Sequence, residues 1–202
     1  MKLGQLETGQ VFEMAGYEWI ALEHNEDRNT TLVVAKECVE VMPFDTEGSN
    51  DYRNSSIRKY LNNDFLEELT DEGVDEDDIV FTDFDLTRYN GEDMYGFCRD
   101  KIGLLTIEQY KKHKEVLTLN DWWWLITASS SNPGYVYIVG STGSLVSNFA
   151  CHGDWGVRPA LALKSDILVS IIGNEGSSED KGLENYSNEE LLQELLRREV
   201  EF

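Results

Sequence analysis

The sequence is short of cysteines and of basic residues. Its 202 residues include three cysteines, Cys38, Cys98 and Cys151, and none of them forms a CxxC pair. An odd number of isolated cysteines argues against a disulfide framework or a zinc knuckle and favours synthesis in a reducing compartment. Lys and Arg number 17 against 39 Asp and Glu, a formal net charge of −22. Because Lys and Arg provide most of the affinity for phosphate groups, we expect no direct binding to nucleic acid and no attraction to an anionic membrane.

Long apolar segments are absent as well. No run approaches the roughly 18 apolar residues that a membrane-spanning helix requires. The first residues lack an apolar stretch and carry Glu7 and Glu13, which argues against a secretory signal. We therefore expect synthesis in the cytoplasm without a signal peptide.

Catalytic motifs are also lacking. The three histidines, His24, His113 and His152, do not occur in an HExxH motif, and there is no GxSxG, Walker or GxGxxG sequence. His152 follows Cys151, but adjacent side chains of an extended strand point to opposite faces, so the two do not readily form a nucleophile–base pair. We expect a protein that is not an enzyme and that uses neither a metal nor a cofactor.

In the first half of the chain, the apolar pattern predicts a hairpin followed by a helix. Residues 11–14 and 17–22 alternate around a turn at Ala15 and Gly16, and a third strand is expected over residues 31–35. Residues 55–69 read as one helix, because apolar side chains recur every fourth position: Ile57, Leu61, Phe65 and Leu69.

The second half begins with a short helix and continues as strands and turns. Thr106 and Gln109 have the spacing of a capping box, so a helix is expected to begin there. Strands are predicted over residues 122–127, 134–139, 144–149 and 155–163. Two helices ahead of a small antiparallel sheet predict an α+β fold.

The tail changes in character after residue 172, so residues 1–172 are expected to form one domain. Residues 173–186 are rich in Gly, Ser, Glu and Asp and read as an acidic flexible linker. Residues 187–202 begin with a capping box and carry a leucine stripe, which predicts an amphipathic C-terminal helix. A helix this short is only marginally stable by itself. We therefore expect it to dock on its own domain or on a partner.

One of the predicted strands carries two tyrosines on a single face. The period of two places Tyr135 and Tyr137 together, with Val136 and Ile138 on the opposite face, toward the core. The loops on either side are rich in Ser, Gly and Asn with a few aromatic residues, which is the composition of an antibody-like binding surface. The same residues also suit ordinary turns and cross-strand tyrosine pairs.

Four segments then resemble a known family when taken in order. They are residues 54–62 (NSSIRKYLN), 101–106 (KIGLLT) followed by Gln109 and Tyr110, 122–125 (WWWL) and 156–161 (GVRPAL). This set resembles an uncharacterised domain family of bacterial and phage proteins with a C-type lectin-like fold. The formylglycine-generating enzymes and the variable proteins of diversity-generating retroelements share that fold. The resemblance covers about residues 10–170 and implies an α+β domain of two helices and small antiparallel sheets.

The resemblance also implies where a ligand binds. The changeable residues of the retroelement-diversified relatives lie between the Trp-Leu strand and the Gly-Val-Arg-Pro strand. Carried onto this sequence, they are Ser129, Ser131, Asn132, Tyr135, Tyr137, Ser147, Phe149, His152, Asp154 and Trp155. Arg158 is read as structural, an anchor for neighbouring loops. The calcium-binding motif of sugar-binding lectins is missing, since Asn132-Pro133-Gly134 does not match it.

Two functions follow as expectations. The first is a non-catalytic ligand-binding module that displays a variable surface to a protein or glycan. The resemblance implies that it is retroelement-diversified or phage-associated, and located in the cytoplasm or on a phage virion. The alternative is a phage-encoded acidic inhibitor or decoy, which would act on a host protein through its negative surface.

Overall fold

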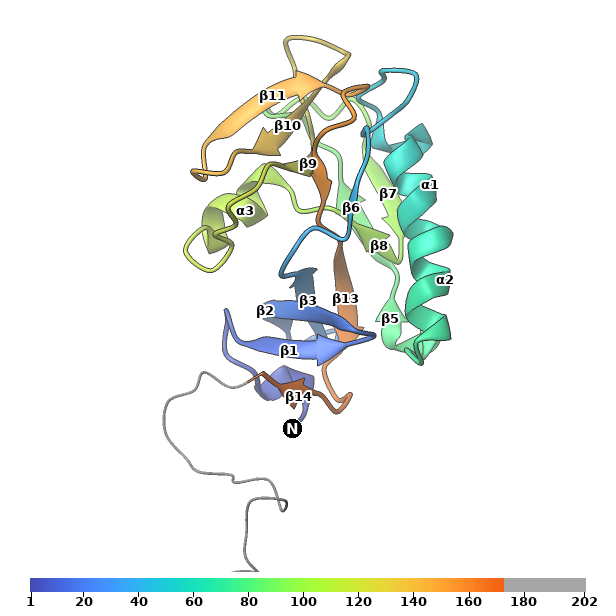
Figure 1. Ribbon diagram of the computed structural model, residues 1–202, viewed down its shortest axis with the longest axis vertical. Helices are drawn as coiled ribbons and strands as arrows, with labels where there is room; N and C mark the ends of the chain where they lie inside the picture. The colour runs from blue at the N-terminus through green and yellow to red at the C-terminus, as the bar shows by residue number, and fades with distance from the viewer. Residues whose placement is uncertain (173–202) are drawn as a thin grey trace, which may run out of the picture. The chain divides into compact units, whose positions relative to one another are not determined.

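The computed structural model describes residues 1–172 (Figure 1). The predicted linker over residues 173–186 and the predicted helix over residues 187–202 lie outside the described residues. Within residues 1–172, no helix combines the length and the apolar character that crossing a membrane requires.

Seven strands form the larger sheet, in the order β14-β1-β2-β3-β13-β5 with β8 paired to β13. They are β1 (Val11–Met14), β2 (Tyr17–Asn25), β3 (Thr30–Ala35), β5 (Ile79–Val80), β8 (Ile102–Gly103), β13 (Ala160–Lys164) and β14 (Ser170–Ile171). The predicted hairpin is confirmed as β1 and β2. Its turn residues Ala15 and Gly16 have φ angles of 53° and 72°, as a two-residue type I′ turn requires.

A second sheet of five strands carries the predicted binding region. Its order is β11-β10-β9-β12-β4, with β4 (Glu40–Val41), β9 (Trp123–Ala128), β10 (Tyr135–Val139), β11 (Leu145–Phe149) and β12 (Gly156–Val157). A separate two-stranded sheet pairs β6 (Thr82–Asp85) with β7 (Phe97–Asp100). The strand predicted over residues 155–163 is divided at Arg158 and Pro159, where the chain leaves the five-stranded sheet and enters the larger one.

The helix predicted over residues 55–69 is present but broken. It consists of α1 (Ser56–Asn62) and α2 (Asp64–Asp71), which are separated at Asn63 by a non-helical backbone conformation. Ser55 Oγ caps α1 by accepting a hydrogen bond from the Arg58 N–H at 3.2 Å. The predicted apolar stripe is fully buried at each of its four positions: Ile57, Leu61, Phe65 and Leu69.

The helix expected at Thr106 is α3 (Ile107–His113), and its capping box is confirmed. The Gln109 N–H donates to Thr106 Oγ1 at 3.1 Å, and the Thr106 N–H donates to Gln109 Oε1 at 2.9 Å. Three single-turn 3₁₀ helices complete the description: η1 (Leu3–Gln5), η2 (Tyr52–Asn54) and η3 (Glu76–Asp78).

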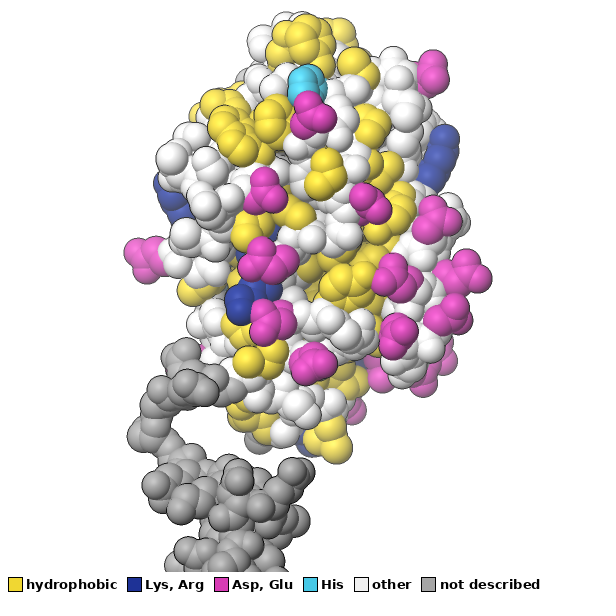
Figure 2. Space-filling model, in the orientation of Figure 1, with side chains coloured by type: hydrophobic (Ala, Val, Ile, Leu, Met, Phe, Trp, Pro, Cys, Tyr) yellow, Lys and Arg dark blue, Asp and Glu magenta, His cyan; other side chains and the backbone are white. Residues whose placement is uncertain are grey.

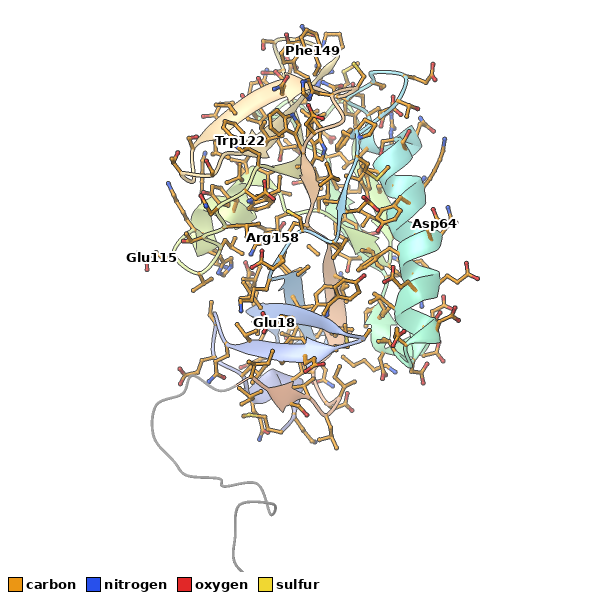
Figure 3. All side chains as sticks on the ribbon, in the orientation of Figure 1. Glu18, Asp64, Glu115, Trp122, Phe149 and Arg158 are labelled. Atoms are coloured by element: carbon orange, nitrogen blue, oxygen red, sulfur yellow. The ribbon has the colours of Figure 1, made fainter. Side chains whose placement is uncertain are left out.

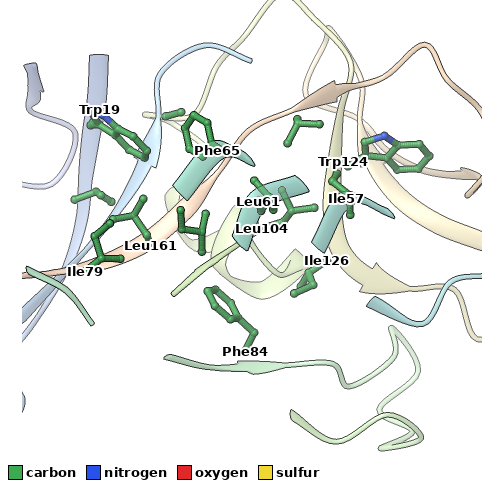
Figure 4. Packing of buried hydrophobic residues seen from close by; sticks show 14 of the residues in the cluster. Trp19, Ile57, Leu61, Phe65, Ile79, Phe84, Leu104, Trp124, Ile126 and Leu161 are labelled. Atoms are coloured by element: carbon green, nitrogen blue, oxygen red, sulfur yellow. The ribbon is translucent and has the colours of Figure 1, made fainter. Parts of the chain in front are cut away.

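Strand β9 lies between two hydrophobic clusters. On one side, Trp124 and Ile126 pack with α1, α2 and the larger sheet, as Figure 4 shows with Leu61, Phe65 and Leu161. On the other side, Trp123 and Leu125 pack against Ile107 and Tyr110 of α3. Because both faces of β9 are buried, this strand fixes the five-stranded sheet between the two clusters.

Arg158, in the segment between β12 and β13, holds the end of β3 and the loop after α3, as its structural interpretation from the sequence anticipates. The side chain is fully buried, and its Nε and Nη1 atoms donate to the carbonyl oxygens of Ala35 at 2.7 Å and Leu117 at 2.9 Å. Its guanidinium carbon lies 4.8 Å from the ring centre of Trp123. Burial lowers the pKa of this guanidinium to about 10.

The predicted fold class is wrong. Strands account for 35% of the described residues and helices for 18%, so the domain is mostly β. The expected α+β domain of the C-type lectin-like type, with two helices, small antiparallel sheets and a C-terminal helix, does not describe it. The error has a physical cause: β4, β5, β8, β12 and β14 are two residues long, too short to show a period of two. These strands nevertheless join separate hairpins into one sheet of seven strands and another of five.

Candidate ligand-binding face

Strands β10 and β11 place four of the ten predicted residues on one face of the five-stranded sheet. Tyr135 lies opposite Phe149 and Tyr137 opposite Ser147 in the antiparallel register. The rings of Tyr135 and Phe149 have their centres 4.3 Å apart, and half of the Phe149 surface is exposed. The opposite face of β10 is core, since Val136 and Ile138 are fully buried, which confirms the prediction for this strand.

Tyr89 adds a third tyrosine to this face from the loop between β6 and β7. Its ring centre lies 5.0 Å from that of Tyr137, and half of its surface is exposed. Lys111 of α3 places its Nζ 5.1 Å from the Tyr89 ring centre. Burial, then the neighbouring Tyr89, raises the pKa of Tyr137 above its ordinary value. We call Tyr89, Tyr135, Tyr137 and Phe149 the aromatic face.

Three other predicted residues lie in the connection between β11 and β12. His152 stacks on Trp155 with ring centres 5.1 Å apart, and Trp155 lies 5.3 Å from Trp122. Both tryptophans pack against the cluster that contains Trp124, which is the side of the sheet opposite to the aromatic face. Asp154 is exposed, with Oδ2 3.5 Å from His152 Nδ1. Figure 3 shows Phe149 and Trp122 at separate places around this sheet.

The last three predicted residues belong to the loop between β9 and β10. Ser129 is buried, and its hydroxyl lies 3.0 Å from that of Ser131. Ser131 and Asn132 are exposed at the tip of the loop. Asn132 Oδ1 accepts a hydrogen bond from the Gly134 N–H at 2.9 Å and tightens the turn. The ten predicted residues are therefore divided between two faces and a loop tip, and they do not form one continuous surface.

Asn50 fixes this loop and was missed by the sequence analysis. Its side chain is buried, and Nδ2 lies 3.2 Å from the carbonyl oxygen of Ser129, 3.1 Å from that of Asn132 and 3.0 Å from that of Tyr135. Its Oδ1 accepts a hydrogen bond of 2.7 Å from the Tyr95 hydroxyl. One amide thereby holds both ends of the loop that leads into the aromatic face.

No periodicity or local spacing in the sequence indicates a role for Asn50 or Tyr89. Asn50 is 79 to 85 residues away from the carbonyl groups that it binds, and Tyr89 lies in a polar loop without periodicity. Local spacing carries no information about such long-range partners.

The aromatic rings of this face provide apolar area with polar hydroxyl groups at their rims. Within residues 1–172, no group of three or more His, Cys, Asp and Glu side chains is arranged to hold a metal ion. Figure 2 shows hydrophobic side chains gathered over the region of β10 and β11, and acidic side chains over α2.

Comparison with known proteins gives one match. A family model described as Domain of unknown function (DUF6273) matches residues 80–165, less than half of the chain. The matched part runs from β5 to β13 and includes the aromatic face, α3 and Arg158. No curated protein and no solved structure matches the chain. The description of the family names no function, so the resemblance to bacterial and phage domains stays a prediction.

Proposed function

We propose that this protein is a non-catalytic binding module that captures a protein or glycan ligand on its aromatic face. The observation that carries the proposal is the pair of Tyr135 and Phe149, whose rings lie 4.3 Å apart with Phe149 half exposed. Exposed aromatic side chains are the most frequent anchors of binding interfaces. Their apolar surface contributes affinity when a ligand covers it, and the tyrosine hydroxyl groups give direction.

Rigidity supports the same proposal. The strand that bears Tyr135 and Tyr137 has its reverse side in the core, and the loop before it is held by Asn50. A surface that is already ordered loses little conformational entropy on binding, so more of the contact energy appears as affinity. Diversification by a retroelement remains part of the proposal. It predicts a near-copy of the codons for residues 127–157 in neighbouring DNA, beside a reverse transcriptase.

The experiment first identifies a ligand and then maps it. Glycan arrays and a display library of peptides and folded domains are screened with the full chain, and amide hydrogen exchange is compared with and without each hit. The proposal expects added protection over residues 135–139 and 145–149 and around Tyr89. Protection confined to the surface of Trp122 and Trp155, or to α2, would contradict it.

A second candidate function rests on the acidic surface around α2. Asp64, Glu67 and Glu68 of α2 are exposed. Burial raises the pKa of Tyr60 to about 12, and Glu40, Glu68 and Asp64 add to the rise. A basic host protein would be attracted there, as the inhibitor hypothesis requires. Affinity for such a partner should fall steeply as salt is added. A partner bound equally well at low and high salt would count against this candidate.

A further inference from the structure

A cleft between the β6 loop and α3 lies apart from the Tyr135–Phe149 pair. It has a volume of about 460 Å³, with Leu32 and Phe84 among its apolar lining residues. Polar side chains from two elements also line it: Asp85, Thr87 and Arg88 from β6 and the loop after it, and Glu108 and Gln109 from the first turn of α3. Ligand pockets combine this size with a few convergent polar groups.

Arg88 provides an unused donor in the wall of this cleft. One tenth of its side chain is exposed. Its Nη2 donates to the Tyr95 hydroxyl at 3.1 Å and its Nη1 to Glu92 at 3.4 Å. Each of these two nitrogens uses one of its two N–H groups in these bonds, which leaves a second N–H on each. A ligand oxygen in the cleft can accept from such a charged donor, and charge-assisted hydrogen bonds are stronger than neutral ones.

The other polar groups are held in place by the backbone. Asp85 Oδ1 accepts hydrogen bonds from the Thr87 N–H at 2.8 Å and from its hydroxyl at 2.6 Å, which leaves Oδ2 as a further acceptor. Gln109 uses Oε1 to cap α3, so its amide Nε2 remains as a donor in a fixed orientation. Glu108 is exposed beside it. The cleft therefore offers donors and acceptors at close spacing, on rigid elements.

We propose that this cleft binds a hydroxyl-rich ligand, a mono- or disaccharide. Each sugar hydroxyl both donates and accepts, so it can bind the Arg88 guanidinium and a carboxylate of Asp85 or Glu108 together. An anionic ligand is disfavoured because Glu92 already faces Arg88 and three further carboxylates, Asp83, Asp85 and Glu108, line the cleft. This site does not depend on the Tyr135–Phe149 pair, and Tyr89 is the residue that borders both.

The test is a titration of the full chain, followed by backbone amide NMR shifts. The probes are glucose, galactose, mannose, N-acetylglucosamine and cellobiose at millimolar concentration, with glycine as a zwitterionic probe. We expect at least one saccharide to shift the amides of residues 82–91 and 106–109. Absence of shifts with every saccharide, shifts confined to other residues, or cleft shifts with glycine alone would overturn the proposal.

Two variants with a matched control make the test specific. Glu108→Ala removes one charged acceptor and should weaken binding about tenfold. Glu115→Ala makes the same change at an exposed residue after α3 that does not line the cleft (Figure 3), and should leave affinity unchanged. Arg88→Lys keeps the charge but removes the planar guanidinium with its several N–H donors, and should weaken binding as well. If Arg88→Lys does not fold, equal affinities of the Glu108 and Glu115 variants would still refute the assignment.

The Tyr135→Ala/Phe149→Ala variant separates this proposal from the proposed function. It should keep saccharide binding in the cleft while losing the ligand of the aromatic face. Loss of the saccharide in that variant, with no effect of Glu108→Ala, would place the sugar on the aromatic face and overturn the cleft assignment.

Discussion

Asn50 is predicted to be the most sensitive single polar residue of the binding region. Its amide group has two N–H donors for the three carbonyl oxygens of Ser129, Asn132 and Tyr135, and its Oδ1 accepts from Tyr95. Asn50→Ala removes about three hydrogen bonds, each worth about 1 kcal/mol net. We therefore expect the free energy of unfolding to fall by about 3 kcal/mol, and the melting temperature by about 6–12 °C.

Asn50→Asp should be worse than Asn50→Ala. The carboxylate has nearly the same shape, but it places a buried negative oxygen against carbonyl oxygens that require a donor. The alanine variant leaves those carbonyl groups unsatisfied without adding a repulsive charge. The order of stability is therefore expected to be wild type, then Ala, then Asp.

The assay is urea unfolding followed by circular dichroism, with amide hydrogen exchange as a local readout. Exchange of the amides of residues 129–135 should accelerate in both variants more than exchange in β2 or β3. Asn54→Ala serves as the matched control, because Asn54 is exposed and lies in the neighbouring turn. A loss below about 1 kcal/mol in Asn50→Ala, or equal effects of the Asn50 and Asn54 substitutions, would refute the role given to this amide.

Three further outcomes follow from the backbone and from buried charges. Ala15→Gly should stabilise the protein by about 1 kcal/mol in urea unfolding, since a non-glycine residue at φ of 53° is strained; a destabilised variant would contradict the turn geometry. Arg158→Met should cost about 3 kcal/mol in the same assay, because two charge-assisted hydrogen bonds, to the end of β3 and to the loop after α3, are lost; a loss within experimental error would show that these bonds do not stabilise the fold. Stability should also fall as the pH rises above about 9. Cys98 and Tyr60 each have a pKa raised to about 12, first by burial, so they stay protonated in the folded state while the unfolded chain releases those protons. The lowered pKa of Arg158 acts in the opposite sense, but it is one group against several whose pKa is raised. Urea unfolding from about pH 8 to pH 11 measures the net change in the free energy of unfolding. A rise in that free energy over this window would contradict the prediction.

The parts that the sequence predicted well depend on neighbours close in the chain. The turn at Ala15 and Gly16, the capping box of Thr106 and Gln109, and the division of β10 into a tyrosine face and a core face each involve residues a few positions apart. Such features follow from local periodicity and capping chemistry, and tertiary contacts then confirm them.

The parts that failed depend on distant partners. The fold class was wrong because two-residue strands, such as β12 and β4, acquire their identity only from the sheet that they join. The break at Asn63 does not interrupt the apolar stripe, so periodicity gave no sign of it. The predicted binding residues were treated as one surface because they are close in sequence. Residues that are close in sequence can lie on opposite sides of one sheet, as Phe149 and Trp155 do.

The affinity of the aromatic-face ligand for two variants tests the central claim most directly. Tyr135→Ala/Phe149→Ala removes the ring pair, and Val146→Ala is the matched control, since Val146 is a partly exposed residue of the same strand that points to the opposite face. Anchoring aromatic residues contribute about 2 kcal/mol or more each, so the double variant should bind at least about a hundredfold more weakly. Both variants should keep the circular dichroism spectrum of the wild type. Equal affinity of the double variant and the Val146 control would contradict a binding function for this face.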